Sequence, residues 1–337
     1  MSVLFLLTTP PPVISGTDAV VQEVELLRSR FGGEVIYLRP SWRARSWYPT
    51  SLLGLHRLHA ITHCDRRVDV CHVFASELFH LPVLRAVTRP IVYTVTSGVG
   101  PEGAMPSLAY LRRLGAIIVP GRADLKVLSD RGLPNVELIL PGIDVNAFVD
   151  AAAPSGPEFV LLAGSAPWAR QHFQTKGVNA MLEVARAMPD LRLVFLWRGV
   201  LLQEVMDRVR RLGLLERVEI LRDRVDVSQV LTRVHAAVVL ATGPGLVRAY
   251  PHSLLEALAA GRPVILSEGN PMAEYVRAME CGRVVPGADV HALAEAISDL
   301  RQNYERFRAR AREIGKRDFS QERLVTAYQS LYGALAT

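Results

Sequence analysis

The sequence predicts an α/β protein of two domains, and three observations indicate this fold class. Short runs of β-branched and other apolar residues alternate with helical periodicity; residues 238–285, for example, read strand, loop, helix, strand, loop, helix. The chain has 337 residues, 50% of them hydrophobic, which is enough for two sizeable cores. Residues 151–157, with the sequence AAAPSGP, have the composition of a linker.

Composition limits the classes of partner. The net charge of +6 comes mostly from arginine and suits an anionic membrane surface, phosphorylated substrates or nucleic acid, or serves only solubility. Because the chain shows no nucleic-acid-binding motif, we expect no nucleic-acid partner. No apolar run reaches the roughly 18–20 residues that span a bilayer. The 3 cysteines lack metal-ligand spacing and indicate a reducing cytoplasm.

The chain begins with a predicted buried strand, Val3–Leu7, rather than a signal peptide, because no basic region precedes the short apolar run. A proline-rich loop and then Gly16 lead into a predicted helix. A strand, a glycine-containing loop and the free N–H groups of a helix start together suit a phosphate, which makes Gly16 a candidate donor contact. An ordinary N-cap formed by Thr17 or Asp18 explains the same pattern equally well.

Residues 35–64 contain no acidic residue, and within them residues 39–58 interleave arginines with Trp42, Trp47 and Tyr48. Such a segment suits a membrane interface, where aromatic rings lie at headgroup depth and each arginine near an anionic surface contributes about 1 kcal/mol. Two interpretations stay open: the segment docks on an anionic membrane, or its tryptophans cover the edge of a domain. Docking would indicate a lipid-linked substrate.

The most informative stretch is residues 238–285. A buried strand at 238–240 ends at Gly-Pro-Gly, and Pro251 opens a helix that Gly261 terminates. This helix is apolar around nearly its whole circumference except at Glu256. A carboxylate among buried neighbours needs a partner. Glu256 either pairs with a cation or backbone N–H groups of the fold, or accepts hydrogen bonds from the hydroxyls of a ligand in a cleft.

Helical periodicity predicts further helices over residues 227–237 and 289–300. Residues 301–317 are strongly basic and are interpreted as a solvated helix face. A final amphipathic helix is expected to begin near Phe319.

Residues 248–264, RAYPHSLLEALAAGRPV, resemble the nucleotide-sugar signature of the retaining GT-B glycosyltransferases of family four. That signature is a Glu, then Gly-Phe-Pro or similar, then Ser-Leu-Leu-Glu-Ala-Met-Ala-Cys-Gly-x-Pro-Val. The second Glu of the family holds the ribose hydroxyls of the donor and corresponds to Glu256. The first Glu lies near the donor sugar and corresponds to Arg248, a reversal of charge. The resemblance implies further donor contacts at Tyr250, Pro251, His252, Ser253 and Leu254.

The resemblance continues in order along almost the whole chain and implies the GT-B fold. In that fold, two Rossmann-like, doubly wound α/β domains face each other across a cleft. We expect an acceptor-side domain at residues 1–150, which a Gly142-Ile143-Asp144 turn closes, and a nucleotide-sugar domain at residues 157–315. The resemblance implies that residues 316–337 form a helix that crosses back to the first domain.

The start of the second domain resembles the family's order of strand, Gly-Arg, loop, Lys-Gly, helix and strand. The resemblance implies that Lys176 neutralises the donor diphosphate. Ser165 occupies the place of the arginine, so Arg170 or Arg198 is a candidate to replace it, unless each is a solvated surface residue. Asp223 lies in the loop where the family reads the nucleotide base. Fixed positive charges can stabilise a leaving diphosphate by themselves, so we expect no metal and no cofactor besides the nucleotide-diphosphate sugar.

In the first domain, a strand predicted at residues 68–74, the fourth expected along the chain, carries His72. This residue fits the first histidine of the family's Asp-Val-(Val/Ile)-His-x-His element, and it is either catalytic or structural. Thr96 stands where the family has another histidine. We expect Thr96 and Ser97, together with Glu77 and His80, to contact the acceptor.

The resemblance implies a metal-independent retaining glycosyltransferase. Its acceptor would be a lipid-linked or cell-surface glycan, and the protein would be cytoplasmic, at times peripheral on the inner face of the membrane. Arg248, Thr96 and Ser165 depart from the family pattern. An alternative is therefore a catalytically degenerate homologue that binds a glycan or nucleotide. A third interpretation is an activated donor whose carboxylate or phosphate meets Arg248.

Overall fold

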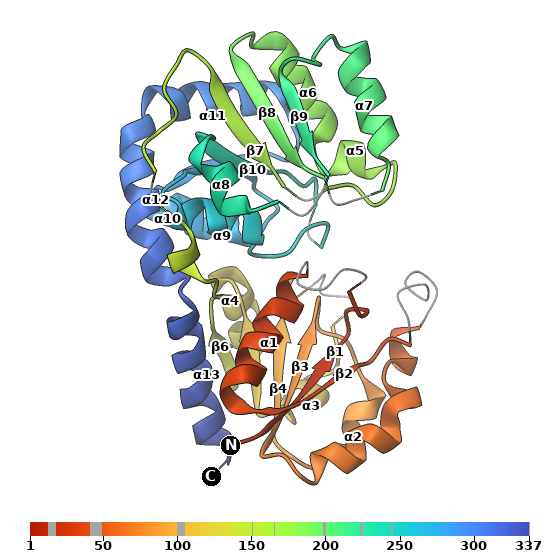
Figure 1. Cartoon of the computed structure of the whole chain (residues 1–337). Helices are drawn as coiled ribbons and strands as arrows, with labels where there is room; N and C mark the ends of the chain where they lie inside the picture. The colour runs from red at the N-terminus through yellow and green to blue at the C-terminus, as the bar shows by residue number, and fades with distance from the viewer. Residues whose placement is uncertain are drawn as a thin grey trace. The chain divides into compact units, whose positions relative to one another are not determined.

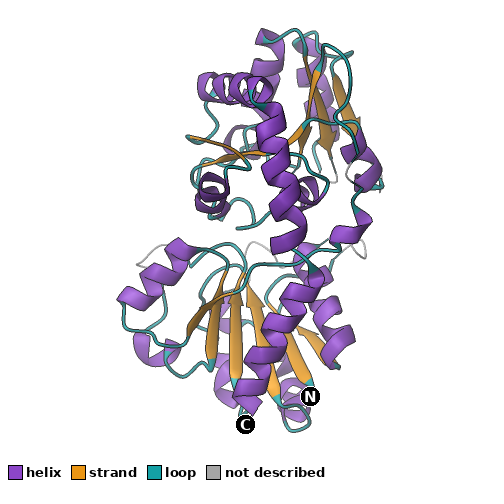
Figure 2. Ribbon diagram, turned by 90° about the vertical axis from the view of Figure 1, so that its left-hand side faces the viewer, coloured by secondary structure: helices purple, strands orange, loops and turns teal. Residues whose placement is uncertain are grey.

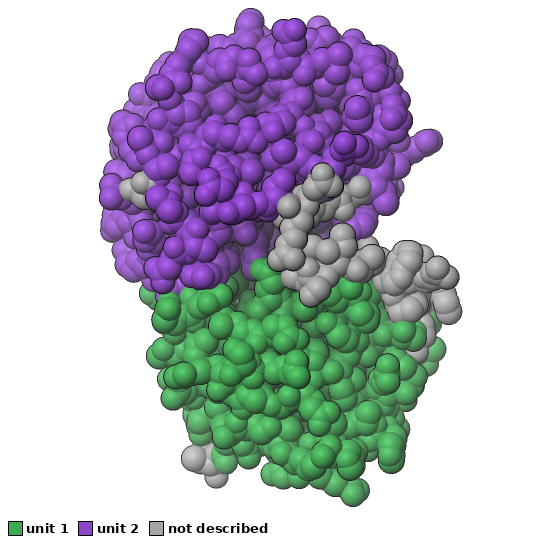
Figure 3. Space-filling view, viewed as in Figure 1, with its two compact units in different colours: residues 1–142, 321–337 green, residues 143–320 purple. Residues whose placement is uncertain are grey.

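The computed structural model describes residues 1–12, 18–40, 49–99, 105–149, 151–164, 166–197, 200–222, 225–243 and 245–336. The chain forms two compact units: unit 1 comprises residues 1–142 and 321–337, and unit 2 comprises residues 143–320 (Figure 3). These limits differ from the predicted ones at residues 150 and 315. Within the described ranges, no helix is long and apolar enough to cross a bilayer.

The first domain ends earlier than the predicted residue 150, because the residues that follow Gly142 belong to unit 2. The N–H of Ile143 donates to the carbonyl of Phe319 at 2.8 Å. The presumed linker is held in the same way, since the buried Arg262 donates to the carbonyl of Ala152 at 3.0 Å, and Arg301 donates to that of Pro157 at 2.7 Å. Residues 151–157 therefore lie against unit 2, although their composition is that of a flexible linker.

Unit 1 contains a six-stranded parallel sheet in the order β2-β1-β3-β4-β5-β6. The predicted strand that carries His72 is β3, the third along the chain rather than the fourth, and it lies between β1 and β4. The strands are β1 (Val3–Leu7), β2 (Gly33–Tyr37), β3 (Val70–Ala75), β4 (Ile91–Val95), β5 (Ala116–Val119) and β6 (Val136–Leu138).

Helices cover both faces of this sheet, as Figure 2 shows. Alternation along β1 separates two cores: Leu4 and Leu6 belong to one core, and Val3, Phe5 and Leu7 to the other. The first core includes residues of α2, α3 and α4, and the second includes residues of α1 and α13. The helices are α1 (Ala19–Phe31), α2 (Leu58–Asp65), α3 (Leu108–Leu111), α4 (Arg122–Asp130) and α13 (Gln321–Ala336), with 3₁₀ turns at Thr50–Leu52, Leu55–Arg57 and Pro82–Ala86.

Unit 2 contains a second six-stranded parallel sheet, in the order β12-β11-β10-β7-β8-β9 (Figure 1). The order reverses direction at β7, as it does in doubly wound α/β sheets. The strands are β7 (Phe159–Ala163), β8 (Leu191–Leu196), β9 (Val218–Leu221), β10 (Ala236–Val239), β11 (Val264–Ser267) and β12 (Gly282–Val285).

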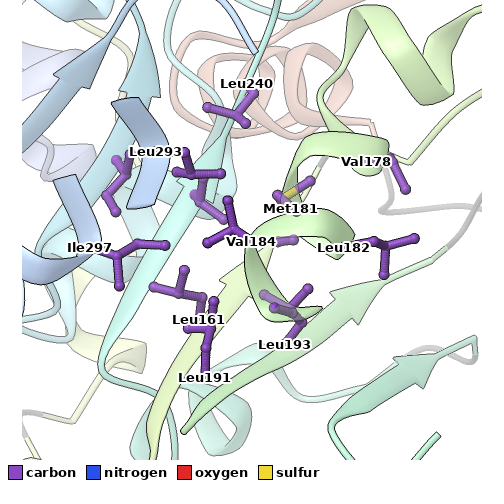
Figure 4. Packing of buried hydrophobic residues seen from close by; sticks show 14 of the residues in the cluster. Leu161, Val178, Met181, Leu182, Val184, Leu191, Leu193, Leu240, Leu293 and Ile297 are labelled. Carbon is purple, nitrogen blue, oxygen red and sulfur yellow. The ribbon is translucent and has the colours of Figure 1, made fainter. Parts of the chain in front are cut away.

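Helices α6, α7 and α11 bury their apolar residues against one face of this sheet, where Leu161 and Leu193 meet Met181, Val184 and Ile297 (Figure 4). The helix predicted over residues 227–237 is too long, because α8 ends at Thr232 and the chain enters β10 at Ala236. The helices are α5 (His172–Thr175), α6 (Val178–Ala187), α7 (Leu202–Arg211), α8 (Val227–Thr232), α9 (His252–Ala259), α10 (Met272–Met279), α11 (Val290–Gln302) and α12 (Tyr304–Asp318), with a 3₁₀ turn at Val145–Ala147.

The basic segment 301–317 lies mostly in α12, and only one side of that helix is a solvated face. Phe307, Ala311 and Ile314 are fully buried on its other side. The charged residues of the segment follow helical spacing around this apolar stripe, so α12 is a packed amphipathic helix of unit 2.

Candidate functional site

The candidate site of unit 2 lies at the carboxyl edge of its sheet. Because the strands are all parallel, their carboxyl ends share one edge, which is where doubly wound sheets bind ligands. Lys176 follows α5, which comes after β7, and Arg248 and α9 follow β10. Contacts between the loops at this edge show how the residues are placed.

Lys176 is held at this edge by the glycine that follows it. Gly177 has a φ of +67°, and a Cβ at this position would lie 2.6 Å from the side chain of Leu240, just after β10. The N–H of Thr242 donates to the carbonyl of Thr175 at 2.9 Å, which joins the same two segments. Only glycine fits both the backbone conformation and the close contact. Lys176 itself is 8% exposed and is therefore fixed beside the end of β10.

The start of α9 lies against the end of β7. A Cβ at Gly164 would come within 2.5 Å of Ser253 Oγ. Pro251 is the N-cap of α9, and within the described part of the chain no side-chain hydrogen bond caps this helix. The Pro251 carbonyl accepts from the N–H groups of Leu254 and Leu255 at 2.9 and 3.2 Å. The positive end of the helix dipole therefore lies at the same edge as Lys176, an arrangement that favours an anion.

The exposed stripe of α9 carries three of the predicted donor residues. His252, Ser253 and Glu256 are partly exposed and share one helix face by their spacing. The side chains of two other predicted donor residues are buried. Leu254 is fully buried because it belongs to the apolar face of α9, and Tyr250 is 5% exposed because it packs in an aromatic cluster with its ring 5.9 Å from that of Phe319.

Arg248 is partly exposed, and its main chain is fixed by Asn270, which the sequence analysis missed. Asn270 Nδ2 donates to the Arg248 carbonyl at 2.9 Å, while its Oδ1 accepts from the N–H of Met272 at 2.8 Å. Asn270 is 3% exposed, so both bonds are shielded from water. The Gly-Asn-Pro sequence directly after a buried strand is a turn signal that could have indicated this role.

Arg170 fits the alternative of a solvated surface arginine. It is exposed, and its Nε lies 3.1 Å from Glu204 Oε2 on α7. Within the described ranges, no group of three or more His, Cys, Asp or Glu side chains is placed to hold a metal ion. Four predicted donor residues lie outside the described residues: Gly16, Ser165, Arg198 and Asp223.

The helix that follows Gly16 has an ordinary N-cap, as one of the two interpretations of its sequence proposed. Asp18 Oδ1 accepts from the N–H groups of Val20 and Val21 at 2.9 and 3.2 Å. The first turn of α1 therefore already uses these two donors within the protein.

Three of the four predicted acceptor residues gather at the carboxyl edge of the sheet in unit 1. The N–H groups of Thr96 and Ser97 donate at 2.8 and 2.9 Å to the carbonyls of the last residue of β3 and of the residue after it, which extends the pairing of β3 and β4. Glu77 follows β3 directly and is partly exposed. His80 is exposed farther along this loop, with its ring 4.7 Å from that of Tyr110.

His72 is not a catalytic residue in this structure, because it is fully buried. Its Nδ1 bonds to the hydroxyl of Tyr332 at 2.5 Å and its Nε2 to Thr94 Oγ1 at 2.7 Å. Thr94 Oγ1 also bonds to the hydroxyl of Tyr328 at 2.9 Å. Desolvation lowers the pKa of His72 well below its ordinary value, so the ring is neutral. This network attaches α13 to β3 and β4.

Replacing His72 is expected to change how the stability of the protein depends on pH. The pKa of buried His72 is lowered from 6.5, so below pH 6.5 the unfolded chain binds a proton that the folded chain does not. The contribution of neutral His72 to the free energy of unfolding is fully present above pH 6.5. As the pH falls below this value, that free energy decreases by up to about 1.4 kcal/mol per pH unit.

Urea unfolding from pH 7.5 to 5.0 should show a shallower acid slope for His72→Gln than for the wild type. His291→Gln, which replaces a histidine whose side chain is 83% exposed, should keep the wild-type slope. Parallel wild-type and His72→Gln profiles would show that His72 does not cause this dependence.

Comparison with known proteins identifies the part of unit 2 that carries this site. Residues 167–318 match the model of the family described as glycosyl transferases group 1. This segment is similar to the group 1 glycosyl transferases. The matched segment includes Lys176, Arg248, Asn270 and all of α9.

Two curated relatives align with parts of the chain. An exopolysaccharide phosphotransferase of Streptomyces coelicolor is 30% identical over 165 residues, which are 47% of this chain and 17% of that protein. A phosphatidyl-myo-inositol mannosyltransferase of Mycobacterium leprae is 30% identical over 132 residues, which are 38% of this chain and 34% of that protein. The chain thus spans well under two thirds of either relative.

A solved structure supports the fold over the whole chain. Anabaena HepE, crystallised in complex with UDP, superposes with a TM-score of 0.72 and 18% identity, covering 99% of this chain and 100% of that one. The chain has the GT-B fold of two Rossmann-like domains, as the resemblance of its sequence predicted.

Proposed function

We propose that the chain is a glycosyltransferase that moves a sugar from a nucleotide-diphosphate sugar to an acceptor hydroxyl. The observation that carries this proposal is the placement of buried Lys176 at the same sheet edge as the start of α9. These two positive features suit a diphosphate, and Glu256 on the exposed stripe of α9 suits the hydroxyls of a ribose. The complex of HepE with UDP supports the same class of ligand.

The proposed mechanism needs no metal ion. As the sugar–phosphate bond breaks, negative charge grows on the departing diphosphate, and Lys176 and the start of α9 stabilise it in place. Arg248, held through its carbonyl by Asn270, adds positive charge next to the transferred sugar. We assign acceptor binding to Thr96, Ser97 and Glu77 of unit 1. Transfer is proposed to retain the configuration of the sugar by attack and departure on one face, so no enzymic nucleophile is required.

Calorimetric titration with UDP, GDP and their sugars, followed by a mass-spectrometric screen for transfer, tests this proposal. We expect one nucleotide to bind and its sugar to be transferred or slowly hydrolysed. Binding without any turnover would favour the second candidate, a degenerate homologue, which the replacement of a glutamate by Arg248 suggests. A protein that binds none of these nucleotides would refute both functions.

We further propose that the acceptor is lipid-linked and that the protein docks on the cytoplasmic face of a membrane through residues 39–58. Three leucines in the described part of this segment are unusually exposed: Leu52 at 44%, Leu55 at 42% and Leu58 at 40%. Exposed Arg57 lies among them, and no acidic residue occurs between residues 35 and 64. Apolar side chains next to basic ones suit an anionic lipid surface.

Replacing Leu52, Leu55 and Leu58 together with serine is expected to lower the affinity for anionic vesicles by at least about tenfold, because the apolar contacts with lipid are lost. Co-sedimentation with phosphatidylglycerol vesicles at low salt measures this change. Leu215→Ser is the control, since Leu215 is 60% exposed but lies in unit 2. Equal sedimentation of the triple variant and the wild type would contradict docking through this segment.

A further inference from the structure

The segment that directly follows β10 contacts both neighbours of Lys176 in the chain. Leu240 is fixed in the hydrophobic core of unit 2 (Figure 4), and its side chain lies against Gly177. The N–H of Thr242 donates to the carbonyl of Thr175 at 2.9 Å. Because Thr175 and Gly177 flank Lys176 directly, the position of the Lys176 main chain depends on how firmly this segment is held.

The middle residue of the same segment, Ala241, is held by a side chain of β11. Its N–H donates at 2.6 Å to Oγ of Ser267, the last residue of that strand. In the sheet, β10 lies between β11 and β7, and Lys176 belongs to the segment that follows β7. Ser267 therefore holds the segment from the side opposite Lys176. Ala241 and Ser267 are 1% and 0% exposed, so water does not compete for this bond.

A second hydrogen bond orients the Ser267 hydroxyl. Its one hydrogen is donated to the carbonyl of Gly287, which follows β12, at 2.9 Å. A lone pair of Oγ is thereby left to accept from the N–H of Ala241. The carbonyl of Ser267 in turn accepts from the N–H of Asn270 at 3.0 Å. This one buried hydroxyl thus joins the carboxyl ends of β10, β11 and β12, and its removal leaves two backbone groups without this partner.

We propose that Ser267 is a positioning residue for the diphosphate site, because it holds residues 240–242, which in turn keep Lys176 in place. Ser267 is fully buried and acts through the backbone rather than by touching a substrate. The attraction between an ammonium and a phosphate depends on their distance, and it is strongest when the two are held in place beforehand. This inference rests on the diphosphate contact of Lys176 in the proposed function and adds the residue that sets its geometry.

Calorimetric titration with UDP and GDP at a temperature well below unfolding tests this role. Ser267→Ala is expected to raise the Kd of the bound nucleotide about fivefold, because Lys176 is held less firmly. Ser267→Thr keeps the hydroxyl and should stay within about twofold of the wild type. Ser267→Cys, whose thiol has a similar size but bonds weakly, replaces the alanine variant if that variant does not fold. Ser298→Ala is the control, since it removes from α11 a hydroxyl that donates to the carbonyl of Ala294 at 2.9 Å.

The same substitution in a Lys176→Gln background separates positioning from a general structural effect. If Ser267 acts through Lys176, Ser267→Ala should change the Kd of the Lys176→Gln protein by less than about 1.5-fold, since the ammonium that it positions is gone. An equal fold-change in both backgrounds, or a wild-type Kd for Ser267→Ala, would overturn the inference. If the nucleotide results are as expected but no sugar is transferred, the proposed transfer is wrong and the inference stands. A wild-type protein that binds neither UDP nor GDP would overturn both.

Discussion

Lys176→Gln is expected to lower kcat for sugar transfer by about 10²–10³-fold, the usual cost of removing one preorganised group that stabilises developing charge. Glutamine is of similar length but carries no charge. It therefore cannot neutralise the diphosphate as the sugar departs. Because the same ammonium is proposed to contact the diphosphate of the bound donor, a smaller rise in the KM for the donor is expected alongside the fall in kcat.

Steady-state kinetics with the donor found in the binding screen measures both parameters. Lys316→Gln is the matched control: it removes one positive charge from an exposed position on α12 of the same unit, and it should leave kcat unchanged. Since Lys176 is buried, the melting temperature of each variant must be compared, and the loss of activity should persist well below the transition. Transfer by folded Lys176→Gln at the wild-type rate would refute the role of this residue.

Gly315→Ala is expected to destabilise unit 2 by about 3 kcal/mol or more, because it introduces a clash that no side-chain movement relieves. A Cβ at Gly315 would lie 2.2 Å from the carbonyl oxygen of Leu258 and 2.6 Å from the N of Ala259, both in the backbone of α9. Helix α12 therefore packs directly on the backbone of α9. A single methyl group has to push α9 away and so displaces the helix that carries Glu256.

A second helical glycine supplies the control. Gly333 lies in α13, and a Cβ there would have no heavy atom within 4 Å. Gly333→Ala is expected to stabilise the protein by up to about 1 kcal/mol, since alanine is the better helix former. Urea unfolding followed by circular dichroism compares the two variants with the wild type. If the two replacements change the free energy of unfolding by the same amount and in the same direction, helix packing does not determine the effect at Gly315.

The α/β architecture could largely be predicted from the sequence, because buried parallel strands appear as short apolar runs between helices. The strands at Val3–Leu7 and Val264–Ser267 were predicted closely in this way. The ends of elements were harder to predict, since periodicity does not show where a helix stops and the next strand begins. Residues 227–237 illustrate this point: their apolar spacing suits a helix, but pairing with β7 and β11 takes the last residues into β10.

Lys176 and Glu256 were proposed as site residues from the sequence, whereas the residue that supports the main chain of Arg248 was missed. The Lys-Gly pair at 176–177 and the helix that contains Glu256 stood out because their local sequence resembles a known family pattern. Asn270 was missed, since a turn signal does not show which main-chain groups its side chain will bind. Its role follows from a contact with Arg248 that only the folded chain creates.

The sequence by itself determined the type and order of the elements and the residues of the proposed diphosphate and ribose contacts, because these depend on neighbours in the chain. Only the tertiary structure showed that His72 is a buried, neutral structural residue. Its Nδ1 forms a hydrogen bond with the hydroxyl of Tyr332, which lies near the other end of the chain. The tertiary structure also decided that residues 151–157 lie on unit 2, where Arg262 binds them. In both cases the physical reason is that hydrogen bonds between residues distant in sequence determine which polar groups are buried.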